Sequence, residues 1–288
     1  MGSSLETIRT RSATDSDGNT SEFSPAIGLA SGAALPCLWN TGVDSSGTVL
    51  ADDAPEPHYI LVQGSPLQGT PFVVRASGLF PIPPWMADNT HSGWIAPTAD
   101  TQASGATDGS AVYRYETAFD LTAFDPSSVV ISGRWSTDNG GRDILINGIS
   151  TGHSNTAQFT EWTPFRIRSG FVAGMNRLTF LVSNGEGEVN PFGPTGLRVE
   201  MDGAGTLNQQ LSIKKRGNQL VLEWQGAGFI LQAADIITGP WIDLSSGTSP
   251  DGVTFEVGVQ PSAPIRFFRL RLDQACTAAL ARTNSLME

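Results

Sequence analysis

Residues 112–151 read VYRYETAFDLTAFDPSSVVISGRWSTDNGGRDILINGIST, and this stretch decides the fold class. It begins with side chains that alternate in character, the period of two expected of a strand with one buried face. One face carries Tyr113, Tyr115, Thr117 and Phe119, and the other carries Arg114, Glu116 and Ala118. The segment therefore predicts a strand that packs on a core through its bulky face.

Two further alternating runs follow, at residues 129–136 and 143–146. The second run ends in Asn147-Gly148, which favours a type I′ turn because both residues tolerate positive φ. The sequence thus predicts a hairpin here. Residues 174–185, GMNRLTFLVSNG, place apolar side chains on both strand faces, which predicts two sheets packed against each other.

The composition favours β structure and argues against several classes of partner. A chain of 288 residues exceeds the usual size of one core, so two modules are expected. With 32 Gly, 18 Pro and 16% charged residues, turns should be frequent and helices scarce. A net charge of −11 repels phosphate backbones and anionic lipids, which disfavours nucleic acid as a partner. We find no apolar run long enough for membrane insertion and no secretion signal at the start of the chain.

The chain divides by pattern into four parts. Residues 1–33 predict a strand that ends a preceding module, followed by a linker, and residues 34–203 form the main domain. Residues 209–272 predict a small β module and residues 273–288 a tail. Within the main domain we expect strands at residues 58–63, 72–76, 112–120, 129–136, 143–146, 177–183 and 196–201.

Three segments of the main domain carry a family resemblance: YRYETAFDL (113–121), ILINGIST (144–151) and GMNRLTFLVSN (174–184). They resemble the galactose-binding-like jelly-roll sandwiches that accompany bacterial glycosidases and surface proteins. The pattern FILQAAD…TGPW…FFRLRL is similar to C-terminal β modules of large secreted bacterial proteins. The resemblance implies an all-β chain: a jelly-roll β-sandwich with a second, smaller β-sandwich-like module, cut from a longer extracellular or cell-surface polypeptide.

The loop FPIPPWMADNTHSGWIAP, residues 80–97, is the first candidate for a ligand site. Indole rings commonly stack on sugar rings while amides and carboxylates bind the hydroxyls. Trp85 and Trp94 could supply the rings, or they could instead plug one end of the core. The candidate hydroxyl partners in this loop are Asp88, Asn89, His91 and Ser92, and those in the turn STDNGGRD (136–143) are Asp138, Asn139 and Arg142.

A structural calcium ion is the one cofactor that the sequence suggests. Asp138, Asn139 and Asp143 offer oxygen ligands around a glycine turn, as a hard cation prefers. The same side chains could instead bond their own backbone in an Asx-type turn. Loop carboxylates could also serve glycoside hydrolysis, but only if two of them lie at a suitable separation.

The two cysteines, Cys37 and Cys276, share no metal-binding or redox spacing. They could form a bridge, or Cys37 could be a buried apolar residue while Cys276 is free in the tail.

The sequence therefore favours a non-catalytic module that binds a polysaccharide, another glycan or a different surface ligand. A structural spacer or adhesin segment is the alternative, and a glycoside hydrolase ranks last. Exposed tryptophans would favour the binding module, and a smooth polar surface with all rings inside would favour the spacer.

Overall fold

The computed structural model describes residues 13–14, 20–21, 32–75, 80–101, 103, 111–185, 193–208, 211–217, 219–225, 229–244, 247–248, 254–259 and 267–272. The chain divides into two compact units. Residues 34–121, 125–205 and 276–288 form what we call the sandwich unit, and residues 1–33, 122–124 and 206–275 form the small unit. Among the residues described, the helical structure consists of one 3-10 turn, η1 (Pro126–Ser128).

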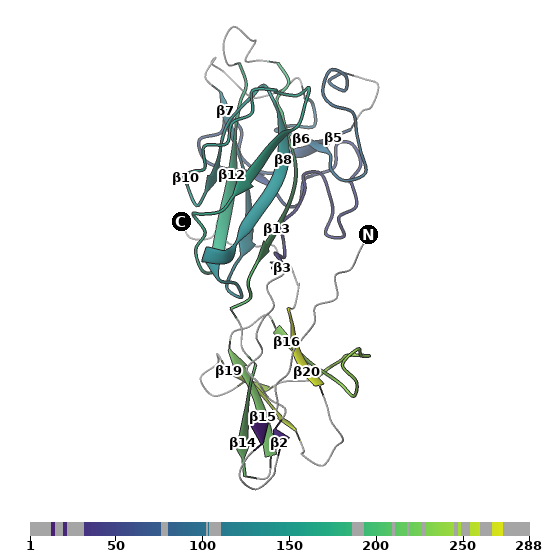
Figure 1. The fold of residues 1–288 in the computed structure, drawn as a ribbon. Helices are drawn as coiled ribbons and strands as arrows, with labels where there is room; N and C mark the ends of the chain where they lie inside the picture. Colours follow the sequence, from purple (N-terminus) through teal and green to yellow (C-terminus); the bar gives the residue numbers. More distant parts are fainter. Residues whose placement is uncertain are drawn as a thin grey trace, which may run out of the picture. The chain divides into compact units, whose positions relative to one another are not determined.

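The sandwich unit contains two antiparallel sheets (Figure 1). The five-stranded sheet has the order β10 (Ile149–Ser150), β9 (Gly140–Ile146), β12 (Met175–Ser183), β7 (Val112–Asp120) and β4 (Ile60–Leu61). The six-stranded sheet has the order β11 (Thr163–Ile167), β8 (Val130–Asp138), β13 (Gly196–Gly205), β6 (Trp94–Ala96) and β5 (Phe72–Val74), with β3 (Ala33–Ala34) also paired to β13.

The chain alternates between the two sheets. It passes from β7 in the five-stranded sheet to β8 in the six-stranded one, then back to β9, across to β11, back to β12 and across to β13. Consecutive long strands therefore lie on opposite layers, which is the arrangement of a jelly-roll sandwich. The predicted all-β fold class is confirmed.

The core lies between the layers and is built from the alternation seen in the sequence. The burial of β7 alternates along its whole length, with Tyr113, Tyr115 and Phe119 at most 1% exposed. From the other layer, Trp135 approaches Phe180 of β12, with ring centroids 5.9 Å apart. Trp135 is fully buried, as predicted. These aromatic side chains supply much of the apolar area that holds the two sheets together.

The hairpin predicted at Asn147-Gly148 is also confirmed. Both residues have positive φ, 51° and 81°, and Ile146 pairs with Ile149 across the turn.

Three strands of the six-stranded sheet were not predicted from the sequence: the two-residue β3, and β11 and β6. Strand β11 contains Pro164, which discourages a strand prediction, but β11 is an edge strand where a missing N–H is tolerated. Strand β6 is short and buried at all three positions, so it shows no alternation.

A second apolar cluster lies on the outer face of the six-stranded sheet. It comprises Val74, Ile82, Trp85, Trp94 and Ala96, with Met86 and Phe159 packed against it. A side chain at Gly196 would meet the Trp85 ring at 2.6 Å, so Trp85 lies over β13. Residues 80–93 thus fold down onto the sheet and cover part of it.

The small unit is a set of short antiparallel sheets (Figure 1). One sheet has the order β14 (Ser212–Arg216), β15 (Gln219–Gln225), β19 (Thr254–Val259) and β18 (Gly247–Thr248). Another has the order β17 (Ile242–Asp243), β16 (Phe229–Ala234) and β20 (Phe267–Leu272), and β1 (Ala13–Thr14) pairs with β2 (Thr20–Ser21). The β structure expected between residues 209 and 272 is present in the described residues, whereas the assignment of residues 1–33 to a preceding module stays a prediction.

Cys37 is part of a disulfide. The alternative in which Cys37 is an unpaired, buried apolar residue is therefore wrong, because its Sγ is bonded to another sulfur and its side chain is only partly buried. Cys276, the other cysteine of the chain, lies outside the described residues, as does the predicted tail.

Candidate functional site

A network of polar side chains covers the outer face of β8 and β13. The register places Arg198 opposite Ser136 and Glu200 opposite Arg134. Trp135 and Val199 also pair with each other, and Trp135 points toward the five-stranded sheet. Since side chains alternate along a strand, Arg134, Arg198 and Glu200 point away from the sandwich core.

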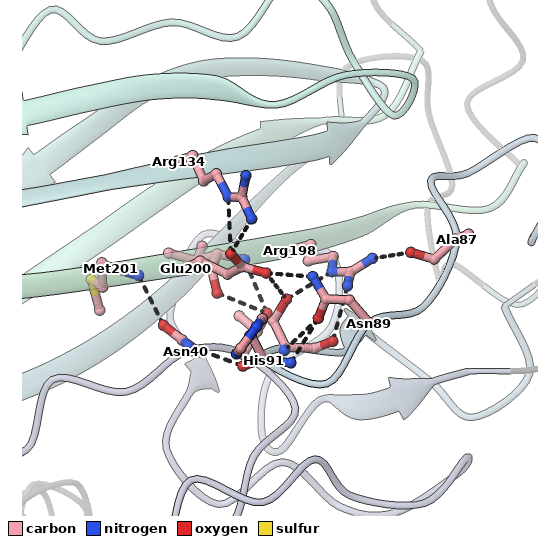
Figure 2. A network of polar contacts seen from close by, with 11 residues as sticks. Asn40, Ala87, Asn89, His91, Arg134, Arg198, Glu200 and Met201 are labelled. Carbon is pink, nitrogen blue, oxygen red and sulfur yellow. Dashed lines mark hydrogen bonds and ion pairs between the residues drawn. The ribbon is translucent and has the colours of Figure 1, made fainter. Parts of the chain in front are cut away.

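Glu200 is the centre of this network (Figure 2). Its Oε1 accepts hydrogen bonds from Asn89 Nδ2 at 2.7 Å and from Ser92 Oγ at 2.8 Å. Its Oε2 accepts bonds from Arg134 Nε at 2.9 Å and Arg134 Nη2 at 2.6 Å. Burial raises the pKa of Glu200, but these hydrogen bonds outweigh burial and hold the pKa below its ordinary value. Glu200 is therefore an anion whose acceptor positions are used inside the protein.

Arg198 ties the loop of residues 80–93 to the sheet. Its side chain is 1% exposed, and burial lowers its pKa although Glu200 and Asp88 favour its charge. Its Nε donates to Ser92 Oγ at 2.8 Å, its Nη2 to the Ser92 carbonyl at 3.0 Å and its Nη1 to the Ala87 carbonyl at 2.8 Å. A guanidinium with its donors used in this way acts as a cross-link (Figure 2).

Trp162 lies beside this network. Its ring centroid is 4.6 Å from Arg134 Cζ and 5.3 Å from Arg198 Cζ, both within the range of a cation–π contact. Trp162 immediately precedes the edge strand β11 and is only partly buried. The face therefore presents a partly exposed indole beside the Arg134 side chain, which is 46% exposed.

The predicted loop residues divide between this network and other places. Asn89 belongs to the network, and its Oδ1 also accepts bonds from the N–H groups of His91 and Ser92. His91 is exposed, and its carbonyl accepts a bond from Asn40 Nδ2 at 2.9 Å. Asp88 lies 3.7 Å from Arg75 Nε.

The stacking role predicted for Trp85 and Trp94 is wrong. Trp85 is 3% exposed and Trp94 is not exposed, and their ring centroids lie 4.6 Å apart inside the outer apolar cluster. Trp85 Nε1 donates to Asp138 Oδ2 at 2.9 Å and Trp94 Nε1 donates to the Met86 carbonyl at 3.0 Å. Both rings are enclosed, as the alternative had it, but in the outer apolar cluster and not at one end of the sandwich core.

The remaining predicted residues are not gathered around one point. Asp138 is 4% exposed at the end of β8, whereas Arg142 is exposed on β9 of the other sheet. Asn139 Oδ1 accepts a bond from Gly185 N, and Asp143 Oδ1 accepts bonds from Ile144 N and Gly152 N. No group of three His, Cys, Asp or Glu side chains among the described residues is arranged to hold a metal ion. Calcium at Asp138, Asn139 and Asp143 stays a prediction.

Two carboxyl groups have the raised pKa that general acid catalysis requires, but both are enclosed. Burial raises the pKa of Glu56 and of Asp138 to about 7 in each case. Glu56 is 2% exposed and accepts bonds from Gly42 N and His58 N, so it anchors backbone. Asp138 is bonded to Trp85 beneath the covering loop. Neither carboxyl is presented to a substrate.

The sequence alone does not single out Trp162, Arg134, Arg198 or Glu200. A signal was present in β13, where Arg198 and Glu200 alternate with Leu197 and Val199 in a strand predicted correctly. Charged residues at alternate strand positions indicate a polar face, but a single sequence does not show which strands meet on that face.

Comparisons with protein-family profiles and with characterised protein sequences find no match. Among solved structures, the chain is similar to a β-glucuronidase from Bifidobacterium dentium, with 13% identity, coverage of 52% of this chain and 33% of that one, and a TM-score of 0.24. The tandem CBM22-1–CBM22-2 domain of Xyn10C from Paenibacillus barcinonensis gives 8% identity, coverage of 85% and 86%, and a TM-score of 0.33. The exo-chitosanase CsxA of Amycolatopsis orientalis gives 15% identity, coverage of 83% and 28%, and a TM-score of 0.27.

The chain spans about a third of the length of the β-glucuronidases that it matches. These TM-scores are too low to assign a fold, so the jelly-roll assignment rests on the strand order of this chain. Within the part of the chain that the structure describes, no helix has the length and apolar character needed to cross a bilayer.

Proposed function

We propose that the sandwich unit is a non-catalytic carbohydrate-binding module of a larger extracellular or cell-surface protein. Its ligand lies on the outer face of β8, β11 and β13, beside Trp162, Arg134, Glu200 and Asn89. The indole proposed to stack on the sugar is thus Trp162, in place of Trp85 and Trp94, and it lies beside the same six-stranded sheet.

Trp162 is the observation that carries the proposal. Trp85, Trp94 and Trp135 are all enclosed in apolar clusters, whereas Trp162 is partly exposed beside fixed polar groups. A partly exposed indole next to oriented hydrogen-bonding side chains is the combination that binds a sugar ring and its hydroxyls.

The polar groups around Trp162 are held in place before any ligand arrives. Glu200 accepts hydrogen bonds from Asn89, Ser92 and Arg134 at the same time. Arg198 Nε donates a hydrogen bond to Ser92 Oγ and so holds that hydroxyl group in place. Side chains that are already ordered lose little rotamer entropy on binding, which favours affinity for a flexible polysaccharide.

Affinity electrophoresis against a panel of soluble plant and microbial polysaccharides tests the proposal. The wild-type chain should be retarded by at least one polysaccharide, and Trp162→Ala should lose about fivefold or more in affinity if stacking contributes about 1 kcal/mol or more. Trp162→Phe should retain part of the binding.

Trp241→Ala is the matched control. Trp241 is also partly buried under a guanidinium, with Arg269 Cζ 4.2 Å from its ring centroid, but it belongs to the small unit. Binding that survives Trp162→Ala as well as it survives Trp241→Ala would contradict the proposed site. A folded chain that binds no polysaccharide in the panel would favour the spacer alternative.

A further inference from the structure

The outer face of the sandwich differs in charge from the chain as a whole. The chain has a net charge of −11, and residues 34–205 contain no lysine. Their cations are Arg75, Arg114, Arg134, Arg142, Arg166, Arg168, Arg177 and Arg198. Three of these arginines lie on adjacent strands of one sheet: Arg134 on β8, Arg166 on β11 and Arg198 on β13.

The register brings these arginines to the same face. Arg166 pairs with Ser132, two positions from Arg134 on β8. Arg166 is exposed and alternates with the buried Phe165 and Ile167, so it points outward as Arg134 does. Within the described residues, the contacts of Arg166 involve its backbone and His153 Nε2.

The hydrogen-bond donors of Arg134 are only partly used. Its Nε and Nη2 both donate to Oε2 of Glu200, and its Nη1 has no hydrogen-bond partner among the described residues. With 46% of the side chain exposed, Nη1 can reach a ligand. Glu200 is 12% exposed, and both of its oxygens already accept bonds within the protein.

The face is therefore rich in donors and poor in unused acceptors. Arg75, Arg134, Arg166 and Arg198 oppose Asp88, Glu200 and the exposed Asp202, which leaves an excess of one positive charge. A guanidinium matches a carboxylate in geometry and charge, whereas a neutral sugar offers it only hydroxyl oxygens.

Building on the proposed function, we propose that the glycan bound here is acidic: a polysaccharide of uronic acid units. Arg134 Nη1 and the Arg166 guanidinium donate to a ligand carboxylate, and Trp162 stacks against the sugar ring. The same positive patch steers an acidic polysaccharide to this face of a chain that otherwise repels it.

Affinity electrophoresis with polygalacturonate, alginate and hyaluronan tests this inference, each polymer being compared with its methyl-esterified form. Esterification keeps the sugar rings and removes the charge. We expect at least one of the acidic polymers to bind, with about tenfold or greater loss of affinity on esterification. The affinity should fall as salt rises from 50 to 500 mM, values chosen to shorten the Debye length severalfold.

Arg134→Gln and Arg166→Gln should each weaken binding of the acidic polymer severalfold. Arg134→Gln also removes hydrogen bonds to Glu200 and could disturb its position. In that case the effect of Arg166→Gln on binding still decides the test. The matched control is Arg177→Gln, since Arg177 is 49% exposed and paired with Glu116 at 3.6 Å but lies on β12 of the other sheet. Near-UV circular dichroism checks that each variant is folded.

The outcomes separate this inference from the proposed function. Equal affinity for acidic and esterified polymers, or equal effects of Arg134→Gln, Arg166→Gln and Arg177→Gln, would overturn the inference. If a neutral polysaccharide then bound in a manner that depends on Trp162, the proposed function would stand without it. Failure of all three acidic polymers to bind would also overturn the inference, and failure of every polysaccharide would overturn both.

Discussion

Trp85 Nε1 donates a hydrogen bond of 2.9 Å to Oδ2 of Asp138, joining the loop of residues 80–93 to the last residue of β8. The donor belongs to a ring that the sequence offers as a sugar-stacking candidate, and the acceptor belongs to the turn that the sequence offers as a calcium site. Because they are buried and hydrogen-bonded to each other, both residues support the fold. The ligand site that we propose lies farther along the same sheet face.

Trp85→Ala should destabilise the sandwich unit by about 3–5 kcal/mol, because it leaves a large cavity in the outer apolar cluster and removes the donor from a buried carboxyl group. Urea denaturation followed by circular dichroism measures this change. Trp162→Ala, at a partly exposed ring, should cost about 1 kcal/mol. Equal losses for the two variants would show that Trp85 is not the buried anchor described here.

The stability of the sandwich unit should fall as pH rises from about 4 to about 7. The pKa of Asp138 is about 7 in the folded chain because of burial, against an ordinary value of 3.8. Between these values the folded state holds a proton that the unfolded state has released, so raising the pH favours unfolding. The slope contributed by one such group is at most about 1.4 kcal/mol per pH unit.

Asp138→Asn should reduce this slope, because an amide keeps an acceptor for Trp85 Nε1 and does not titrate. Glu56, whose pKa is also about 7 through burial, contributes a second slope of the same sign. Asp138→Asn combined with Glu56→Gln should therefore flatten the profile further. Urea unfolding at intervals from pH 4 to 8 measures it, and stability that rises over this range in the wild-type chain would contradict the assignment.

Arg198→Met should destabilise the sandwich unit by about 3–5 kcal/mol, because it leaves the Ser92 and Ala87 carbonyls and the Asp88 charge without their buried cation. Arg134→Met removes the charge from a side chain that is 46% exposed and should cost at most about 1 kcal/mol. Thermal unfolding of the two variants gives the comparison. If both lost the same stability, Arg198 would not be the cross-link.

Gly141→Ala should be strongly destabilising, since the new methyl group would lie 2.5 Å from Trp135 Cη2 in the main core. Overpacking of this kind typically costs about 1–3 kcal/mol. Ser169→Ala, at an exposed position, is the control and should be nearly neutral. A change in near-UV circular dichroism from Trp135 should accompany the loss of stability, and an unchanged spectrum with unchanged stability would mean that Gly141 does not contact the indole.

The sequence predicts well the elements whose pattern is local. The alternation of Tyr113, Tyr115 and Phe119 predicts β7, and Asn147-Gly148 predicts the turn between β9 and β10. It fails where the deciding contact is distant. Pro164 argues against a strand at β11, because proline is tolerated only in strands at the edge of a sheet. The sequence does not show that β11 lies at such an edge.

The candidate site shows the same division. Asn89 could be named from the sequence because amides in a loop are suited to hydroxyls, but its partner Glu200 lies 111 residues away. Trp85 and Trp162 are both tryptophans beside prolines or polar residues, and nothing local tells which ring is enclosed. Their burial depends on which strand or loop covers them.

The amino-acid sequence by itself determined the all-β class, the strand faces and the main hairpin, since these follow from the period of the side chains and from turn chemistry. Only the tertiary structure decided that Trp85 is enclosed, that Asp138 lies beneath it, and that Arg134, Arg198 and Glu200 share one face with Trp162. Strand register and loop packing set these relationships, and both depend on contacts between residues far apart in the chain.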